Sequence, residues 1–283
     1  MNSFLAGALF LVAMYVLRFA FVFFLTRYYK EDLKSNLDFN SKQIIFETLL
    51  FGSIFSLFYH LSNSLITNEI GFALVNIFII SIIPTYVYIL QPFIHLFDKS
   101  ESANEGAYVD DRGLITYHIK VIDKNLINAY ATGIIPFSKT ILIGKPLLMH
   151  LKDAELLSIK LHEAGHLKYN HLSKLYVANL LLSIFFYFIL QIRSAYFDFD
   201  TNSANILSVG LLGCLYGFLV WYIPGKIQYR FELEADRFAA LTNGKENLIN
   251  ALLVLDRLSN GEVSKGGVTH PKLNVRIENI KSL

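Results

Sequence analysis

Two histidines four residues apart, with a glutamate directly after the first, have the types and spacing to carry chemistry. His162, Glu163 and His166 form the HExxH pattern. Because residues four apart lie on one face of a helix, both imidazoles can bind the same metal ion. Glu163 would lie beside the open position of one Zn²⁺ ion per chain, where it can take a proton from bound water and pass it to the leaving amine. The alternative is two surface histidines that share this spacing by chance.

The third metal ligand must come from elsewhere in the chain. His171 follows His166 by five residues, so on a continuous helix it is turned away by about 140°, and we expect a solvated or interfacial side chain. Glu232 is the best candidate. It shares a helical face with Asp236, whose carboxylate can accept the second ring N–H of a ligating histidine, and with two alanines that would let helices pack closely. The alternative is an amphipathic helix with exposed acidic side chains.

Two apolar segments explain how His166 and Glu232 could meet. Residues 174–193 and 205–224 each approach the roughly 20 apolar residues that cross a bilayer as a helix. His166 lies about eight residues before the first segment and Glu232 about eight residues after the second, so at 1.5 Å per residue both stand about 12 Å from the membrane. We expect an antiparallel hairpin that brings the two side chains to the same height.

Three further apolar segments precede this hairpin, at 4–25, 46–66 and 70–92, so about five transmembrane helices are expected. The first lacks the features of a cleavable signal peptide and reads as an anchor. The second carries polar residues, which leaves an interfacial helix as the alternative. Basic residues follow the first segment but are absent from the loops at 67–69 and 194–204. This pattern predicts a multi-pass protein of the cell (inner) membrane, with its catalytic domain facing the cytoplasm.

The expected fold is mainly α-helical, with a small α+β metallopeptidase domain beside the membrane helices. A linker-like stretch at 98–106 opens that domain, and Ile, Val, Tyr and Thr between turn signals predict short antiparallel strands from Tyr108 to Ile143. The HExxH helix follows, with Asp153 as its N-cap and an end near His171. The predicted organisation is an N-terminal membrane region at 1–97, a catalytic domain at 98–173, a transmembrane hairpin at 174–224, and the C-terminal part of the catalytic domain at 225–283.

Composition and charge limit the class of protein. With 54% hydrophobic and only 17% charged residues, the chain is too apolar for an ordinary soluble protein, so the lipid bilayer is an expected partner. The net charge of +2 arises from 25 basic and 23 acidic residues and gives no support for nucleic-acid binding. The single cysteine, Cys214, cannot form an internal disulfide, and its apolar surroundings predict a buried, inert thiol.

In these motifs the sequence resembles the membrane zinc metallopeptidase family that includes HtpX and the CAAX prenyl proteases. The matching elements lie between residues 125 and 277. They are His162-Glu163-Ala164-Gly165-His166, Glu232-Leu233-Glu234-Ala235-Asp236, Asn128-Ala129-Tyr130-Ala131, and Thr269-His270-Pro271 with Arg276. The resemblance implies a gluzincin-like site with Glu232 as the third ligand and Asp236 behind it. It also implies an edge strand at Asn128, Ala129 and Tyr130 that pairs with extended substrate backbone.

For His270 and Arg276 the resemblance implies catalytic contacts to substrate or to the oxyanion formed during attack. The alternative is a helix N-terminus at 269–271 with a surface arginine one turn on. Relatives of the HtpX type usually have two membrane segments before the catalytic domain, and the prenyl proteases have more helices and a closed chamber. Three segments before and two after match neither pattern, so substrate class does not carry over.

The function predicted from these features is that of a zinc endopeptidase acting on membrane-associated or misfolded polypeptides at the cytoplasmic face. The alternative is a catalytically silent binding or regulatory membrane protein that retains the peptidase fold. An intramembrane protease is disfavoured, because Lys160, Lys168 and Asn170 flank the motif and would be costly in lipid. Neither the oligomeric state nor the identity of the substrate can be read from the sequence.

Overall fold

The computed structural model divides the chain into two compact units, Met1–Ile79 and Ile80–Leu283. The structure describes residues 73, 74, 77, 81, 84–90, 101–110, 113–122, 127–196 and 202–283. The predicted segments at 4–25 and 46–66, and most of the one at 70–92, lie outside these residues.

A four-stranded sheet forms one wall of the domain, with the order β1-β2-β4-β3. Its strands are β1 Glu101–Asp110, β2 Gly113–Ile122, β3 Ala129–Thr132 and β4 Thr140–Gly144. The pairs β1–β2 and β3–β4 are antiparallel, as expected, but β2 and β4 run parallel, so the sheet is mixed and the prediction of an antiparallel sheet was wrong in this respect. Turn signals report which strands are joined by a hairpin, not which strands become neighbours across the sheet.

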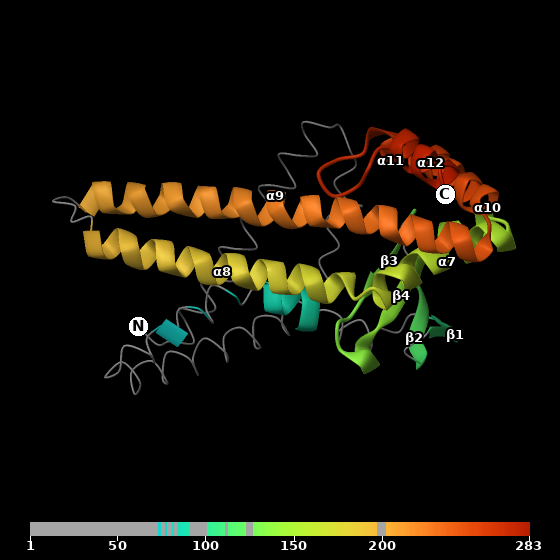
Figure 1. The fold of residues 1–283 in the computed structure, drawn as a ribbon, viewed down its shortest axis with the longest axis horizontal. Coiled ribbons are helices and arrows are strands. Elements are labelled where there is room, and N and C mark those ends of the chain that lie inside the picture. Colours follow the sequence, from blue (N-terminus) through green and yellow to red (C-terminus); the bar gives the residue numbers. More distant parts are fainter. Residues whose placement is uncertain are drawn as a thin grey trace. The chain divides into compact units, whose positions relative to one another are not determined.

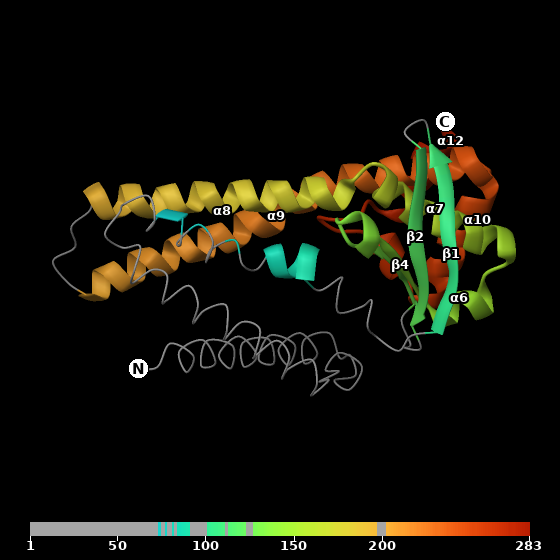
Figure 2. The ribbon, with the colours of Figure 1, turned by 90° about the horizontal axis from the view of Figure 1, so that it is seen from below.

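The first strands also differ from the prediction in length. β1 and β2 each have ten residues and form a hairpin in which Asp110 lies opposite Gly113 (Figure 2). The stretch predicted as a linker at 98–106 therefore enters the sheet from Glu101 onwards. The polar composition of this stretch does not favour a strand. Strand formation depends strongly on the neighbouring strand, and pairing with β2 supplies the backbone hydrogen-bond partners.

Helices close the core of the domain. They are α6 Lys145–His150, α7 Asp153–Lys168, α10 Lys245–Leu258, α11 Glu262–Lys265 and α12 Leu273–Lys281. Of these, α6 and α7 contact the sheet, α10 packs on α7, and α11 and α12 pack on α10. Apolar side chains of β4, α6, α7, α10 and α12 meet at the centre; Ile141, Leu147, Leu248 and Ile280 are fully buried there. Burial of such side chains contributes about 1.5–3 kcal/mol each relative to exposure, so this core fixes α7 firmly.

The helix that carries HExxH ends before the predicted position. α7 stops at Lys168, Asn170 adopts a left-handed conformation with φ of 53°, and a new helix begins at His171. Asparagine tolerates this conformation and commonly ends helices. The prediction of a continuous helix to His171 was therefore wrong, and so was the side-chain direction inferred from it.

Two long helices, α8 His171–Tyr196 and α9 Asn202–Asn243, lie side by side as an antiparallel hairpin (Figures 1 and 2). Within the described ranges, α8 and the Gly210–Asn243 part of α9 are the helices long and apolar enough to cross a membrane. The predicted segments at 174–193 and 205–224 fall on them. A total of five membrane helices is not confirmed, because the other three segments fall on residues that are mostly not described.

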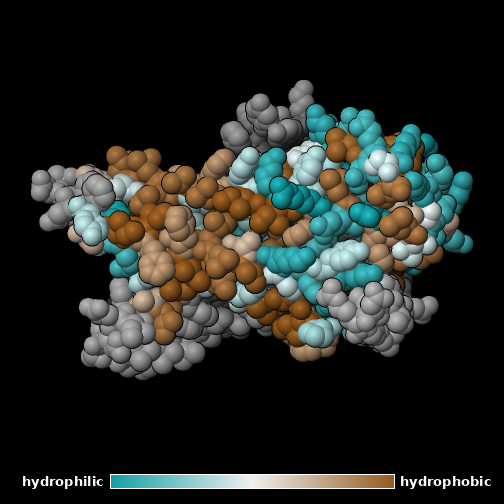
Figure 3. All heavy atoms as spheres, viewed as in Figure 1, coloured by the Kyte–Doolittle hydropathy of each residue, from teal (hydrophilic) through white to brown (hydrophobic). Residues whose placement is uncertain are grey.

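α9 continues without interruption through Pro224 into the ligand-bearing stretch, so the helix predicted at 226–241 is not separate. We call residues 202–224 the hairpin end of α9 and residues 225–243 its site end. Apolar residues dominate the surface around the hairpin end in Figure 3, and its large side chains are exposed. Cys214 is exposed here too, so the prediction of a buried thiol was wrong.

Candidate metal centre

The two ligand-bearing helices are in close contact because small residues meet where they cross. Gly165, inside the HExxH motif, packs on the site end of α9. A Cβ atom at this position would lie 3.2 Å from the Ala235 Cα, which is tighter than ordinary van der Waals contact. Ala235 and Ala239 are fully buried. The small side chains thus bring the helical faces of His162 and Glu232 together.

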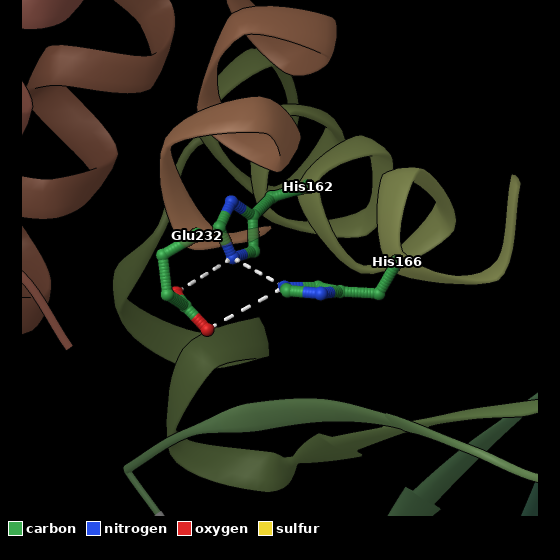
Figure 4. Close-up of side chains that lie close together, drawn as sticks. All are labelled: His162, His166 and Glu232. Atoms are coloured by element: carbon green, nitrogen blue, oxygen red, sulfur yellow. Dashed lines mark hydrogen bonds and ion pairs between the residues drawn. The ribbon is translucent and has the colours of Figure 1, made fainter. Parts of the chain in front are cut away.

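His162, His166 and Glu232 converge on one point (Figure 4). The His162 Nε2 atom lies 3.3 Å from the His166 Nε2 atom and 3.4 Å from the Glu232 Oε2 atom. The His166 Nε2 atom lies 3.6 Å from the Glu232 Oε1 atom. A tetrahedral Zn²⁺ with bonds of about 2.0–2.1 Å keeps its ligand atoms roughly 3.3–3.4 Å apart. Two imidazole nitrogens and a carboxylate oxygen in this geometry therefore fit zinc.

A buried ion pair lies behind His162. The Asp236 Oδ1 atom is 2.9 Å from the His162 Nδ1 atom, and Arg276 donates two hydrogen bonds to Asp236, at 2.7 Å to Oδ2 and 2.6 Å to Oδ1. Burial by itself lowers the pKa of His162, but the carboxylates of Asp236 and Glu232 outweigh burial and raise it to about 10. The imidazole thus carries a proton that a bound cation would replace.

His171 lies behind the other histidine, although the sequence predicted a solvated side chain. It is fully buried, its Nδ1 atom is 3.1 Å from the His166 Nδ1 atom, and its Nε2 atom is 3.0 Å from the Glu234 Oε2 atom. The helix break at the left-handed residue Asn170 lets the His171 side chain lie against His166 of α7. Tyr169-Asn170 was the sequence signal for this break, because asparagine is favoured where a helix ends in a left-handed residue.

Glu163 is buried on the cleft side of the metal ligands. Its Oε2 atom accepts a hydrogen bond of 2.7 Å from the Ala131 backbone N–H of strand β3. Burial raises the pKa of Glu163 to about 7, and this effect outweighs the opposing influence of His162. A carboxylate that exchanges its proton near neutral pH suits general acid–base catalysis. The contact with Ala131 was not foreseen from the sequence.

His270 comes to the site on the loop between α11 and α12. Its Nδ1 atom lies 3.4 Å from the Glu232 Oε1 atom, and its side chain is 55% exposed. The loop approaches α9 at Gly225, where an added Cβ would lie only 2.7 Å from the Val268 Cγ1 atom. Arg276, by contrast, is buried against Asp236. His270 thus faces the cleft beside the candidate ligand Glu232. The guanidinium of Arg276 is instead bonded to Asp236, the carboxylate behind His162.

A cleft of about 480 Å³ opens in front of these groups. Asn128, Ala129 and Tyr130 line it, next to apolar residues of α7, α8 and α10. β3 is the edge strand of the sheet on this side and pairs only with β4 among the described strands. The backbone N–H of Ala129 is bonded to the Asn128 side chain and that of Ala131 to Glu163. This edge of the sheet therefore runs along the cleft beside the candidate base.

Comparison with known proteins finds one family and several relatives. Residues 96–283 match the family model described as peptidase family M48. The chain is 29% identical over 140 residues to Protease HtpX homolog 1 of Streptomyces coelicolor, a match that covers 48% of this chain and 46% of the relative. It is 33% identical over 96 residues to Protease HtpX homolog of Bacteroides fragilis, covering 33% of this chain and 30% of the relative. The matches thus span about half of these relatives' length or less.

Among solved structures, the crystal structure of S. mikatae Ste24p is similar, with a TM-score of 0.60 and 20% sequence identity. The match covers 84% of this chain and 64% of that one. At this level of identity the likeness concerns the fold alone.

Proposed function

The chain belongs to peptidase family M48, and from this premise we propose that it is a zinc-dependent endopeptidase anchored in a membrane. The observation that carries the proposal is the meeting of His162, His166 and Glu232 within 4.8 Å of one another, with Glu163 beside them. Two imidazoles, a carboxylate and a neighbouring glutamate are what metal-assisted peptide hydrolysis requires.

Each residue of the site has a distinct role in the proposed reaction. Zn²⁺ held by His162, His166 and Glu232 would supply a Lewis acid for the scissile carbonyl and would lower the pKa of a water molecule. Glu163 takes the water's proton and delivers it to the leaving amine, while the hydrogen bond from Ala131 fixes the orientation of its carboxylate. His270, exposed to the cleft beside Glu232, is placed to donate to the oxygen that becomes negatively charged. Arg276 acts indirectly, by fixing Asp236 against His162.

The substrate in this proposal is an extended polypeptide that pairs with the edge of β3. The carbonyl groups of Ala129 and Ala131 would accept hydrogen bonds from its backbone, because the N–H groups of the same residues already have partners. Backbone pairing recognises any extended chain, so selection would favour polypeptides that are unfolded or membrane-associated. The apolar lining by Leu172 and Leu175 of α8 agrees with a substrate segment close to the membrane.

The proposed location is the cell (inner) membrane, with the metal centre in the cytoplasm. Support comes from the exposed apolar surface of α8 and of the hairpin end of α9 (Figure 3), because large apolar patches of this kind mark membrane or partner contacts. The orientation rests on the loop charges, since the sequence between 194 and 204 contains no lysine or arginine.

The decisive experiment compares wild type with Glu163→Gln. Both are purified in detergent and loaded with zinc, and each is incubated with an unfolded protein such as casein and with candidate membrane proteins. We expect Glu163→Gln to keep one zinc ion per chain and to lose hydrolysis by at least about 10²-fold, because general base catalysis is removed. Asp153→Asn, at the exposed start of the same helix, is the matched control and should cleave as wild type does.

Equal hydrolysis by wild type and Glu163→Gln would remove this mechanism. Zinc bound to a wild type that cleaves none of the substrates would instead favour the silent binding or regulatory protein.

A further inference from the structure

His166 has a histidine behind it where His162 has a carboxylate. His171, the first residue of α8, places its Nδ1 atom 3.1 Å from the His166 Nδ1 atom. The other ring nitrogen of His171 is 3.0 Å from the Glu234 Oε2 atom. A line of polar atoms thus runs from the metal position through two imidazoles to a carboxylate that is 54% exposed.

The positions of the protons follow from this line. The His166 Nε2 atom faces the other two ligands, so it must be free of hydrogen to bind a cation, and Nδ1 then carries the hydrogen. His171 Nδ1 has to accept that hydrogen bond, which places its own hydrogen on Nε2. Glu234 accepts from there. The opposite arrangement would put a hydrogen on the His166 Nε2 atom, where it blocks the metal position.

The surroundings leave His171 little freedom to rotate. Phe231 stacks on one face with ring centroids 4.1 Å apart and an interplanar angle of 1°. Tyr169 is also stacked on it, at 5.6 Å and 30°. Phe231 and Glu234 come from the same stretch of α9 as Glu232, so one helix supplies a metal ligand, the stacking surface and the final acceptor.

We propose that His171 and Glu234 are positioning residues that hold His166 in the tautomer whose Nε2 atom binds the metal, and that they thereby set the affinity of the site for zinc. The inference rests on the proposed metal centre. Groups that orient metal-bound histidines typically change metal affinity by about 10–100-fold when they are removed. His171 does not touch the substrate or the ion in this proposal; it acts through His166.

The test measures the zinc affinity of the purified full-length protein by competition with a chelator of known affinity. His171→Phe keeps the stacking on Phe231 but cannot accept a hydrogen bond, and we expect it to bind zinc about 10–100-fold more weakly. His171→Gln offers an amide oxygen to His166 and an amide N–H to Glu234, and we expect it to restore most of the affinity. Arg237→Ala, an exposed change on the same helix, is the control and should bind as wild type does.

A purely structural role for His171 gives a different pattern. Both substitutions would then lower the midpoint of thermal unfolding of the zinc-free protein, and the glutamine variant would not differ from the phenylalanine variant in zinc affinity. The absorption spectrum of the Co²⁺-loaded protein provides a second readout, because the positions and intensities of its d–d bands report the ligand geometry around the ion. We expect His171→Phe to change this spectrum and His171→Gln to preserve it.

If His171→Phe does not fold, Glu234→Ala tests the same inference. Glu234 lies at the surface, so its substitution is less disruptive to folding. We expect weaker zinc binding for Glu234→Ala and near-normal binding for Glu234→Gln, whose amide oxygen still accepts from His171. Unchanged affinity in both His171→Phe and Glu234→Ala, in a wild type that binds zinc and hydrolyses peptides, would overturn this inference alone. A wild type that binds no zinc would overturn the proposed function as well.

Discussion

The two ends of α9 have the same backbone conformation but opposite surroundings. At the site end, ionisable side chains are buried: Asp236 is fully buried and Glu232 is 4% exposed. At the hairpin end, large apolar side chains are exposed, with Leu211 at 63% and Trp221 at 56%. In a protein surrounded only by water this distribution would be unfavourable at both ends. It becomes favourable if the hairpin end lies in lipid and the buried acids are held by histidine, arginine and a metal ion.

Glycines show the same contrast. Gly165 contacts Ala235 of the site end so closely that a Cβ would be crowded, whereas a Cβ on Gly213 or Gly217 of the hairpin end meets no described atom within 4 Å. Glycines spaced by four residues, as Gly213 and Gly217 are, can let another helix approach closely. Among these three glycines, the close approach to another described helix lies at Gly165, where the two ligand-bearing helices cross.

The largest expected effect comes from removing the ligand at the site end. Glu232→Ala takes away one of three ligand atoms, so we expect the zinc content to fall from about one ion per chain to about none and hydrolysis to disappear. Leu241→Ala, an exposed change on the same end of the helix, should retain both. Metal analysis of the two purified variants is the measurement. Full zinc content in Glu232→Ala would show that the ion is held by other groups.

The second effect is a dependence of zinc affinity on pH. Burial and the neighbouring His162 lower the pKa of His166 to about 3, so it is already neutral, whereas His162 with a pKa of about 10 is protonated. Zinc must therefore displace one proton from the pair. Apparent affinity should rise about tenfold for each unit of pH between about 7.5 and 9. Chelator competition at several pH values measures this slope, and a flat profile would contradict the charge assigned to His162.

The third expected effect is a difference in stability between substitutions at Gly165 and at Gly213. Gly165→Val forces a branched side chain against the Ala235 backbone, and we expect a loss of about 1–3 kcal/mol in the free energy of unfolding, as for other overpacked contacts. Gly213→Val meets no described atom within 4 Å and should not lower stability. Thermal unfolding of both zinc-loaded variants in the same detergent tests the pair. Helix propensity alone would favour valine over glycine at both positions, so equal losses would mean that the contact with Ala235 does not decide the effect at Gly165.

Much of this arrangement was accessible from sequence because it depends on local spacing. The two histidines of HExxH share a helical face, and Glu232 lies at the matching distance beyond the apolar hairpin, on the same face as two alanines. The structure brings His162, His166 and Glu232 together. The family resemblance is confirmed by the match over residues 96–283.

Features that depend on tertiary context were not accessible. The direction predicted for the His171 side chain assumed a continuous helix, which the left-handed residue Asn170 interrupts. The parallel pairing of β2 with β4 joins strands that are not consecutive in sequence. The bonding of Arg276 to Asp236 links residues 40 positions apart. In each case the partner lies on another element, and periodicity within one element carries no information about it.

The smallest effect is expected at the hairpin end. Leu211→Ala removes apolar atoms from an exposed position, and substitutions at exposed sites usually change stability by less than about 0.5 kcal/mol. We therefore expect the unfolding midpoint in detergent and the zinc affinity to stay at the wild-type values. A buried leucine would behave differently, because Leu→Ala in a packed core costs about 2–5 kcal/mol. A loss of that size would mean that protein, and not lipid, covers Leu211, and the contrast between the two ends of α9 would then reflect two protein interfaces instead of two solvents.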